Sequence, residues 1–345
     1  MRILFFASGS GGHIYPSLSL ISKLIDKHEI GYVVVKDSLE ERIIKDQRIR
    51  KIRINISNKA SYYKKSFYKI PSLLKNIIYL SKIAKQYDLI FSFGGFVSVI
   101  ASVVSKLSKT PLYLHEQNRT LGDGNKFALK YAKKIFTVYE DLKIEQKYKS
   151  KVYLVGNPRG EEAAFLKVRH EHKPFKILFL AGSLGSSTLL NKIKETISKI
   201  DDKNIYFTIL TGHKLYKEYK QFFNFDNVNV IEYQENMLHL MSESSLIILR
   251  AGATSLQEVI SLNIPSIVIP SPYVKHNHQE ENAMYYHNKN AIIMIKENEV
   301  ENNLVSTILK LKNDIFLYYT LIENMKKVSL NNACTLIIKE IENEK

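Results

Sequence analysis

The sequence predicts an α/β protein with two doubly wound parallel sheets, and three observations support this class. Short apolar runs alternate with amphipathic stretches along the chain, as expected for parallel strands connected by helices. The alternation occurs twice, on either side of the Gly- and Pro-containing segment 155–160. A chain of 345 residues, 45% of them hydrophobic, is also long enough to fill two ordinary cores.

The apolar runs define the predicted strands in chain order. In the first half they cover residues 2–7, 31–35, 51–56, 89–93, 111–114 and 135–138. In the second half they cover residues 176–181, 205–211, 228–231, 246–249, 266–269 and 291–294. We expect one domain over residues 1–160 and a second over 161–345. Ligands of open α/β sheets bind beyond the carboxyl ends of the strands, so the expected site is a cleft between the domains.

A glycine-rich loop, Ser8-Gly9-Ser10-Gly11-Gly12-His13, connects the first predicted strand to an amphipathic stretch over 14–24. Glycines allow the backbone to approach a ligand closely, and the N–H groups at a helix start favour an anion. The spacing is not G-x-G-x-x-G, so a nicotinamide-binding fold is the weaker interpretation. Pro16 is tolerated in a first helical turn and predicts a helix that begins near His13.

Three further glycine loops follow predicted strands, at residues 93–96, 181–185 and 250–255. A glycine in any one of them is more often a generic turn or helix-packing residue, but four such loops divided between two domains indicate a cleft that holds a diphosphate. Glu258 is expected in the first turn of the helix after the last loop. Its carboxylate would either accept hydrogen bonds from the two hydroxyls of a ribose or complement the helix dipole.

The composition excludes several classes of protein. Cys334 is the only cysteine, which excludes a disulfide framework and suits a reducing cytoplasm. The first apolar run is too short for a secretion signal, and no run approaches the roughly 20 residues that span a bilayer. Asp-x-Asp is absent, and His276 and His278 would project to opposite sides of an extended chain. We therefore expect no metal and no cofactor.

The net charge of +16 comes from 50 Lys and Arg against 34 Asp and Glu, and it is unevenly distributed. No acidic residue occurs between Gln47 and Tyr87. A codon bias toward Lys explains the total charge, but it does not explain the absence of every carboxylate from one segment.

Residues 61–75 within this segment mix aromatic, aliphatic and cationic side chains. This mixture is typical of a surface that docks on lipid headgroups, although a helix with its apolar side packed inward and its lysines in water is the alternative. No nucleic-acid-binding motif accompanies the charge, so we expect an anionic membrane surface, and no nucleic acid, as the partner. The candidate membrane-facing residues are Tyr63, Lys64, Lys65, Phe67, Lys69 and Leu73.

Six short segments together are more informative than any single loop. They are residues 9–16 (GSGGHIYP), 114–118 (LHEQN), 155–158 (VGNP), 182–185 (GSLG), 250–253 (RAGA) and 278–283 (HQEENA). Their order and spacing resemble those of the MurG glycosyltransferases, from residue 1 to about 295. The HEQN, RAG and HQxxNA signatures are specific to that family within the wider GT-B group.

The resemblance implies a GT-B fold, in which an acceptor- and membrane-facing Rossmann-like domain opposes a UDP-sugar-binding one. The last helix is then a candidate to pack back on the first domain. The implied reaction is an inverting transfer of N-acetylglucosamine from UDP-N-acetylglucosamine to the C4 hydroxyl of undecaprenyl-pyrophosphoryl-muramyl peptide, in peptidoglycan synthesis. Such an enzyme would work peripherally on the cytoplasmic face of the cell membrane.

The resemblance also implies roles for individual positions. The loop at Ser10 would face the donor diphosphate, the backbone of Gln234 the uracil, and Gln279 the sugar hydroxyls. The implied substrate-binding residues are Ser10, Gly11, Gly12, Asn118, Arg159, Ser183, Gln234, Ala253, Thr254, Ser255, Leu256, Gln257, Glu258 and Gln279. Two positions depart from the family. Arg159 stands one residue before the usual arginine, so its diphosphate contact is open, and Phe96 replaces a common tyrosine in the acceptor pocket.

The chemistry of sugar transfer needs a base for the attacking hydroxyl and stabilisation of the departing diphosphate. His13 suits the first task, because a helix N-terminus disfavours the charged form of an imidazole. The alternative role for His13 is hydrogen-bond donation to a phosphate. Glu116 is the second candidate base, and its alternative role is to brace the loop at 115–118.

Two other functions stay open at this stage. One is a different GT-B enzyme that uses a UDP-sugar, such as a glycolipid transferase or an epimerase, although the HEQN segment argues against it. The other is a non-catalytic membrane-surface protein with a decayed transferase fold, which the displaced Arg159 would fit. Donor turnover distinguishes these possibilities.

Overall fold

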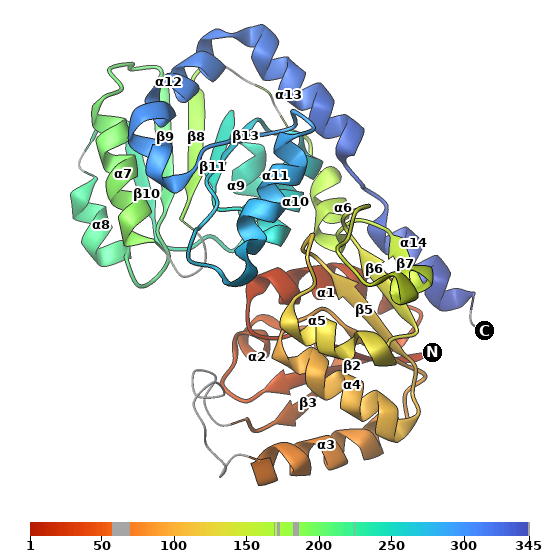
Figure 1. Cartoon of the computed structure of the whole chain (residues 1–345). Helices are drawn as coiled ribbons and strands as arrows, with labels where there is room; N and C mark the ends of the chain where they lie inside the picture. The colour runs from red at the N-terminus through yellow and green to blue at the C-terminus, as the bar shows by residue number, and fades with distance from the viewer. Residues whose placement is uncertain (57–69, 169, 171–172, 182–185, 224, 344–345) are drawn as a thin grey trace. The chain divides into compact units, whose positions relative to one another are not determined.

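The computed structural model describes every residue except 57–69, 169, 171–172, 182–185, 224 and 344–345 (Figure 1). The chain folds into two compact units, one formed by residues 1–159 with 332–345 and the other by residues 160–331. Each unit contains one sheet whose neighbouring strands are parallel. The predicted α/β class with two doubly wound sheets is therefore confirmed.

The first unit is built on a seven-stranded sheet with the order β3-β2-β1-β4-β5-β6-β7. The strands are β1 (Arg2–Phe6), β2 (Glu29–Val35), β3 (Ile49–Ile54), β4 (Leu89–Ser92), β5 (Leu112–Glu116), β6 (Lys134–Thr137) and β7 (Val152–Leu154). All six strands predicted for this half are present. The sequence analysis did not predict β7, a short edge strand whose residues are only partly buried or exposed.

Helices cover the sheet of the first unit. They are α1 (Gly11–Leu24), α2 (Leu39–Ile43), α3 (Ile70–Ala84), α4 (Phe96–Ser108) and α5 (Asp123–Ala128), followed at the boundary by α6 (Pro158–Ala164). Aromatic rings form much of one core layer: Phe91 lies 5.7 Å from Phe5, 5.0 Å from Phe93 and 5.7 Å from Phe136 between ring centroids. Such offset stacks add to the free energy gained by burying the rings.

The start of α1 differs from the sequence prediction. The helix begins at Gly11 with Ser10 as its N-cap, two residues earlier than the expected start near His13. Pro16 consequently falls in the second turn instead of the first, where its ring nitrogen donates no helical hydrogen bond. The prediction was wrong because Gly11 and Gly12 were assigned to the loop, although glycine is tolerated in a first turn that a ligand can approach.

The second unit is built on a six-stranded sheet with the order β10-β9-β8-β11-β12-β13. Its strands are β8 (Phe175–Leu180), β9 (Ile205–Leu210), β10 (Val228–Ile231), β11 (Leu246–Leu249), β12 (Ser266–Val268) and β13 (Ile293–Met294). Its helices are α7 (Ser187–Ser198), α8 (Tyr216–Phe222), α9 (Met237–Ser242), α10 (Ala253–Leu262), α11 (His278–His287), α12 (Val300–Asn313) and α13 (Ile315–Val328).

The C-terminal helix α14 (Ala333–Glu342) belongs to the first unit (Figure 1). Cys334, Ile337 and Ile341 are buried in the core layer that also contains the aromatic rings. Lys134 on β6 donates to the carboxylate of Glu340 at 2.8 Å and to its backbone carbonyl at 3.1 Å. The chain thus returns to its first sheet after completing the second unit.

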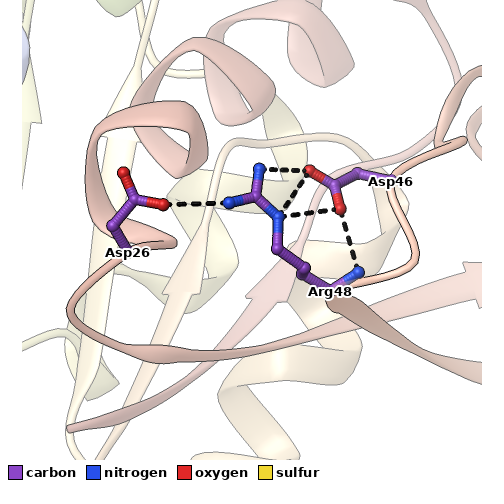
Figure 2. A network of polar contacts seen from close by, with 3 residues as sticks. All are labelled: Asp26, Asp46 and Arg48. Atoms are coloured by element: carbon purple, nitrogen blue, oxygen red, sulfur yellow. Dashed lines mark hydrogen bonds and ion pairs between the residues drawn. The ribbon is translucent and has the colours of Figure 1, made fainter.

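Arg48 connects two turns at the amino-terminal ends of the strands in the first unit (Figure 2). Its guanidinium donates to Asp26, after α1, at 2.9 Å and to Asp46, before β3, at 2.8 Å. These side chains are exposed, so the network contributes little to stability. A pocket of about 230 Å³ opens beside Arg48, between the starts of β1, β2 and β3.

Candidate active site

The loop after β1 leads directly into α1 at the carboxyl end of the strand. Gly9 has a φ of 97°, a conformation that favours glycine, and Gly9 and Ser10 are exposed. Gly11 and Gly12 are partly exposed as the first residues of the helix. Because the first N–H groups of a helix have no intrahelical acceptor, this end favours an anion.

His13 lies in the first turn of α1, partly buried beneath this loop. Its Nδ1 is 3.2 Å from the backbone carbonyl of Ser8. A carbonyl only accepts, so the neutral imidazole carries its hydrogen on Nδ1 and keeps a lone pair on Nε2. Burial lowers the pKa of His13, against smaller raising effects from the Ser8 carbonyl and the charge of Glu116. The imidazole is therefore poised as a proton acceptor near neutral pH.

Two glycines between β4 and α4 make room for the imidazole. Gly94 and Gly95 have φ values of 102° and 76°. A Cβ atom at Gly94 would lie only 3.1 Å from Nε2 of His13, and one at Gly95 would lie 3.2 Å from the Ser8 carbonyl oxygen. The second glycine loop thus contacts the histidine of the first loop, a connection that the sequence did not predict.

Glu116 ends β5, and its carboxylate oxygens are occupied by four hydrogen bonds. Oε1 accepts from the backbone N and from Nδ2 of Asn118, at 2.9 and 3.0 Å. Oε2 accepts from the backbone N of Gly122 at 3.0 Å and from Nδ2 of Asn125 at 2.9 Å. A carboxylate has about four lone-pair sites, so these donors saturate it. This geometry favours the bracing role of Glu116 and keeps Asn118, which is partly exposed, in place.

A buried polar network extends from Glu116 across the unit. Asn125 on α5 accepts from Ser98 Oγ at 2.9 Å, and Ser98 on α4 contacts Ser92 Oγ at 2.7 Å. Ser92 in turn donates to the Phe6 carbonyl at 3.2 Å. The network therefore joins the ends of β5, β4 and β1. Sequence reasoning missed Asn125, Ser98 and Ser92, because a polar residue in an apolar stretch does not reveal its partner.

His115, next to Glu116, is fully buried, and its contacts are with the protein core. Its Nε2 contacts the Gly156 carbonyl at 2.9 Å, and its ring stacks on Phe93 with centroids 5.2 Å apart. Burial lowers the pKa of His115 to about 4, although the Gly156 contact opposes the shift. The ring is accordingly neutral at physiological pH and connects β5 to the loop that contains Gly156.

Arg159 reaches the start of α1 despite its displacement from the family pattern. Its backbone N donates to Oδ1 of Asn157 at 2.9 Å, and its guanidinium lies 5.2 Å from the ring centroid of Tyr15. Tyr15 packs against Gly11, since a Cβ there would lie 3.1 Å from its ring. The arginine is thus adjacent to the glycine loop. Phe96, the other departure, is the exposed first residue of α4.

In the second unit, α10 begins at Ala253 after the N-cap Gly252. Ala253 and Ser255 are partly exposed, Thr254 is buried, and all three belong to the first turn. One prediction about this helix was wrong. Glu258 lies in the second turn, not the first, and is 5% exposed. The side chain of Leu256 is fully buried, and its N–H donates to the Gly252 carbonyl.

The other predicted residues of the second unit have different environments. Gln257 donates to the hydroxyl of the buried Tyr286, which ties it to α11. Gln279, the second residue of α11, accepts from the backbone N of Ser271 at 2.8 Å. Gln234 is partly buried after β10, beside the exposed Tyr233. Ser183 lies outside the described residues.

Arg250, directly after β11, connects several loops of the second unit. Its Nη1 donates to the carbonyls of Ile269 and Pro270, both at 3.3 Å, and its Nη2 to Ser186 Oγ at 3.0 Å. Its guanidinium also forms an ion pair with Glu297. The RAG signature contains this arginine, but its contacts with neighbouring loops could not be predicted from the sequence.

The predicted membrane-facing residues Tyr63, Lys64, Lys65, Phe67 and Lys69 lie outside the described part of the chain. Leu73 on α3 is partly buried and packs against the core of the first unit, so its side chain is a poor candidate for lipid contact. Leu74, Ile78 and Tyr79 on the same helix are 53%, 56% and 48% exposed.

The described residues contain neither a membrane-spanning helix nor a group of side chains suited to a metal ion. None of the helices in that part of the chain is long and apolar enough to cross a membrane. Within the same residues, no three His, Cys, Asp or Glu side chains are grouped so that they could hold a metal ion.

Two family models match the chain: the N-terminal domain of glycosyltransferase family 28 over residues 3–137, and its C-terminal domain over residues 176–340. The curated UDP-N-acetylglucosamine--N-acetylmuramyl-(pentapeptide) pyrophosphoryl-undecaprenol N-acetylglucosamine transferase of Pediococcus pentosaceus is 33% identical, over 96% of each sequence. The protein of the same name from Caldicellulosiruptor saccharolyticus is 30% identical, over 99% of this chain and 97% of that protein.

Solved structures agree with the architecture of two parallel sheets. Acinetobacter baumannii MurG is similar with a TM-score of 0.79 and 22% identity, over 99% of both chains. UDP-GlcNAc 2-epimerase from Neisseria meningitidis, solved with bound UDP-GlcNAc, has a TM-score of 0.71 and 17% identity over 99% of this chain and all of that one. These likenesses show the fold, and the predicted GT-B class is confirmed.

Proposed function

Because the chain belongs to the MurG family within glycosyltransferase family 28, we propose that it transfers N-acetylglucosamine from UDP-N-acetylglucosamine to undecaprenyl-pyrophosphoryl-muramyl peptide. The acceptor group is the C4 hydroxyl of the muramyl sugar, and the product is the disaccharide lipid of peptidoglycan synthesis. The observation that carries this proposal is the 33% identity, over 96% of both sequences, to the Pediococcus pentosaceus enzyme of that name.

His13 is the proposed general base. The acceptor hydroxyl attacks the anomeric carbon from the face opposite the diphosphate, so the configuration inverts. The new C–O bond forms as the bond to the β-phosphate oxygen breaks, and UDP leaves with the electron pair. The hydroxyl proton passes to Nε2 of His13, whose lone pair is available because Nδ1 is bonded to Ser8. General-base catalysis of this kind typically contributes about 10²- to 10⁴-fold.

Glu116 has a positioning role in this scheme. Its four hydrogen bonds hold the loop from Asn118 to Asn125, and its negative charge favours the imidazolium that forms on His13. The partly exposed Asn118 is then available to a sugar or the diphosphate through its amide oxygen.

The donor diphosphate is proposed to bind at helix starts. Ser10, Gly11 and Gly12 offer one such site in the first unit, with Arg159 held beside it on the ring of Tyr15. The first turn of α10, residues 253–255, offers another in the second unit. Ser183 is proposed to contribute to the same donor site.

The remaining donor contacts are assigned within the second unit. Glu258 is proposed to accept hydrogen bonds from the ribose hydroxyls, and the backbone of Gln234 to contact the uracil. Gln279 is proposed to bind the sugar hydroxyls. Its amide nitrogen Nε2 can donate to them, while its Oε1 accepts a hydrogen bond from the backbone N of Ser271.

Docking on an anionic membrane surface is proposed for the first unit, because the acceptor's polyprenyl chain stays in the bilayer. The exposed Leu74, Ile78 and Tyr79 of α3 lie among the exposed Lys75 and Lys82. Apolar side chains at the acyl boundary and lysines near anionic headgroups add their contributions when they occupy one face. The cytoplasmic face of the cell membrane is the proposed location.

Release of UDP from UDP-N-acetylglucosamine, measured with and without the muramyl lipid, tests the proposed reaction. We expect release that depends on the lipid acceptor and forms a disaccharide product. Conversion of the donor into its C2 epimer without any acceptor would instead indicate an epimerase. Absence of donor turnover under all conditions would indicate a non-catalytic protein of the same fold.

A further inference from the structure

Glu40 is a buried carboxylate that the proposed reaction does not use. It is the second residue of α2, and its surface is 0% exposed. Its Oε1 accepts hydrogen bonds from Ser8 Oγ at 2.7 Å and from the backbone N of Val35 at 3.2 Å. Its Oε2 has no hydrogen-bond partner within the described part of the chain.

This placement of Glu40 is energetically unfavourable by itself. A buried carboxylate is costly unless hydrogen bonds or an opposite charge compensate it, and only one of its two oxygens is compensated here. An apolar side chain would fill the same space between α2 and the sheet at a lower cost. The contact with Ser8 is therefore the feature that distinguishes Glu40 from an ordinary core residue.

Ser8 links Glu40 to the histidine of the active site. The hydroxyl of Ser8 donates to Glu40, while its carbonyl accepts the Nδ1–H of His13 at 3.2 Å. The bond from Val35 anchors Glu40 to the last residue of β2, so Ser8 is held from a rigid strand. Ser8 precedes Gly9, whose φ of 97° is a conformation that favours glycine.

We propose that Glu40 is a positioning residue for the general base. Through Ser8, it fixes the carbonyl that keeps the His13 hydrogen on Nδ1 and leaves Nε2 as the proton acceptor. Glu40 touches neither the sugar nor the diphosphate in this arrangement. The inference rests on the base role proposed for His13, whereas a purely structural role for Glu40 would leave the His13 tautomer unchanged.

Nitrogen-15 NMR of histidine-labelled protein tests the effect on the tautomer directly. The His13 signals are those that disappear in His13→Ala. In the wild type we expect the hydrogen on Nδ1. In Glu40→Ala we expect a mixture of tautomers, and in Glu40→Gln we expect the wild-type tautomer, because an amide oxygen can accept both bonds. A wild-type tautomer in Glu40→Ala would overturn the proposal.

Kinetics provide a second readout. We expect Glu40→Ala to lower kcat at least about tenfold through misplacement of the base, with the donor KM changed less than about twofold. Glu40→Gln should restore kcat to within about threefold of the wild type. The matched control is Glu41→Ala on the same helix, since the carboxylate of Glu41 pairs with Arg53 and accepts a hydrogen bond from the backbone N of Asp37. It should keep the wild-type kcat and tautomer.

A double variant distinguishes this inference from the proposed function. In the His13→Ala background, Glu40→Ala should have no further effect on kcat. If Glu40→Ala lowers kcat as much in the His13→Ala background as in the wild type, the positioning role of Glu40 is overturned and the base role of His13 stands. If His13→Ala alone keeps the wild-type kcat, the base role of His13 and the positioning role of Glu40 are both overturned. If Glu40→Ala fails to fold, Ser8→Ala removes the same hydrogen bond but keeps the carbonyl. An unchanged tautomer in that variant would also overturn the proposal.

Discussion

Arg250 and Glu297 form a buried ion pair, with Nη1 and Oε2 2.7 Å apart and both side chains only 8% exposed. The same guanidinium donates hydrogen bonds to Ser186, the N-cap of α7, and to the carbonyls of Ile269 and Pro270, which follow β12. Ser186 comes directly after the glycine loop 182–185 in the sequence. Arg250 therefore connects the segments that carry the proposed donor-binding residues of the second unit.

Glu297→Gln should destabilise the second unit strongly. Removing one partner of a buried pair leaves an uncompensated charge, which typically costs about 3–5 kcal/mol. We expect a lower thermal midpoint and a higher donor KM. Glu323→Gln, in the exposed pair with Lys326, is the matched control and should change stability by less than about 1 kcal/mol. Equal midpoints for the two variants would contradict the structural role of Arg250.

His13→Ala should lower kcat at least about a hundredfold while the donor KM changes only a few fold, because a base acts mainly in the transition state. Steady-state kinetics with the lipid acceptor measure both quantities. Retention of more than about a tenth of the wild-type kcat, with chemistry shown to be rate-limiting, would remove His13 from the base role.

The pH dependence of kcat/KM should report the lowered pKa of His13. A base acts in its neutral form, so activity falls as the pH drops through its pKa. Because burial lowers this pKa below the ordinary histidine value of 6.5, the acid limb should have its midpoint below that value. The residual activity of His13→Ala should lack this limb. An acid limb that persists unchanged in His13→Ala would show that the imidazole is not the titrating base.

Periodicity predicts the fold well because the central strands of both sheets are apolar on both faces. β1 and β4 are buried almost throughout, and such runs are visible without any knowledge of their partners. The edge strand β7 was missed because its residues are only partly buried. The helix start at Gly11 was missed because glycine weakens a local helix signal that the tertiary structure overrides.

The candidate site could be predicted only in part. Glycine loops and an ionisable residue at a helix start are local signals, and they led to Ser10, Gly12 and His13. The hydrogen bonds that hold the surrounding loops are not local: Glu40 meets Ser8 across 32 positions of sequence, and Gln117 meets Phe93 across 24. A single sequence contains no signal for such pairings, because the topology of the sheet creates them.

Glu258→Gln should raise the donor KM more than it lowers kcat. The proposed role of its carboxylate is to accept hydrogen bonds from the ribose hydroxyls, and an amide accepts them with only one oxygen. Initial rates at varied UDP-N-acetylglucosamine measure the effect. Glu243→Gln, next to α9, is the control, because Glu243 is exposed and pairs only weakly with His239 at 3.4 Å. An unchanged KM for Glu258→Gln would contradict the assignment.

Reversing the charge of lysines in the segment between Gln47 and Tyr87, which contains no acidic residue, should abolish binding to anionic vesicles. Replacing Lys75 and Lys82 of α3 by Glu removes two attractions and adds two repulsions, each worth about 1 kcal/mol near the surface. The corresponding triple variant of Lys64, Lys65 and Lys69 should behave in the same way. Sedimentation with vesicles that contain anionic lipid, at physiological salt, measures the binding.

The same α3 variant should keep its activity on a short-chain, water-soluble acceptor, since neither lysine belongs to the proposed catalytic set. Lys310→Glu with Lys327→Glu makes the same change of net charge on exposed positions of α12 and α13 in the second unit. This control should still sediment with the vesicles, because it leaves the lysines and the exposed Leu74 and Ile78 of α3 unchanged. Equal loss of binding in both variants would mean that net charge, and not this face, drives membrane association.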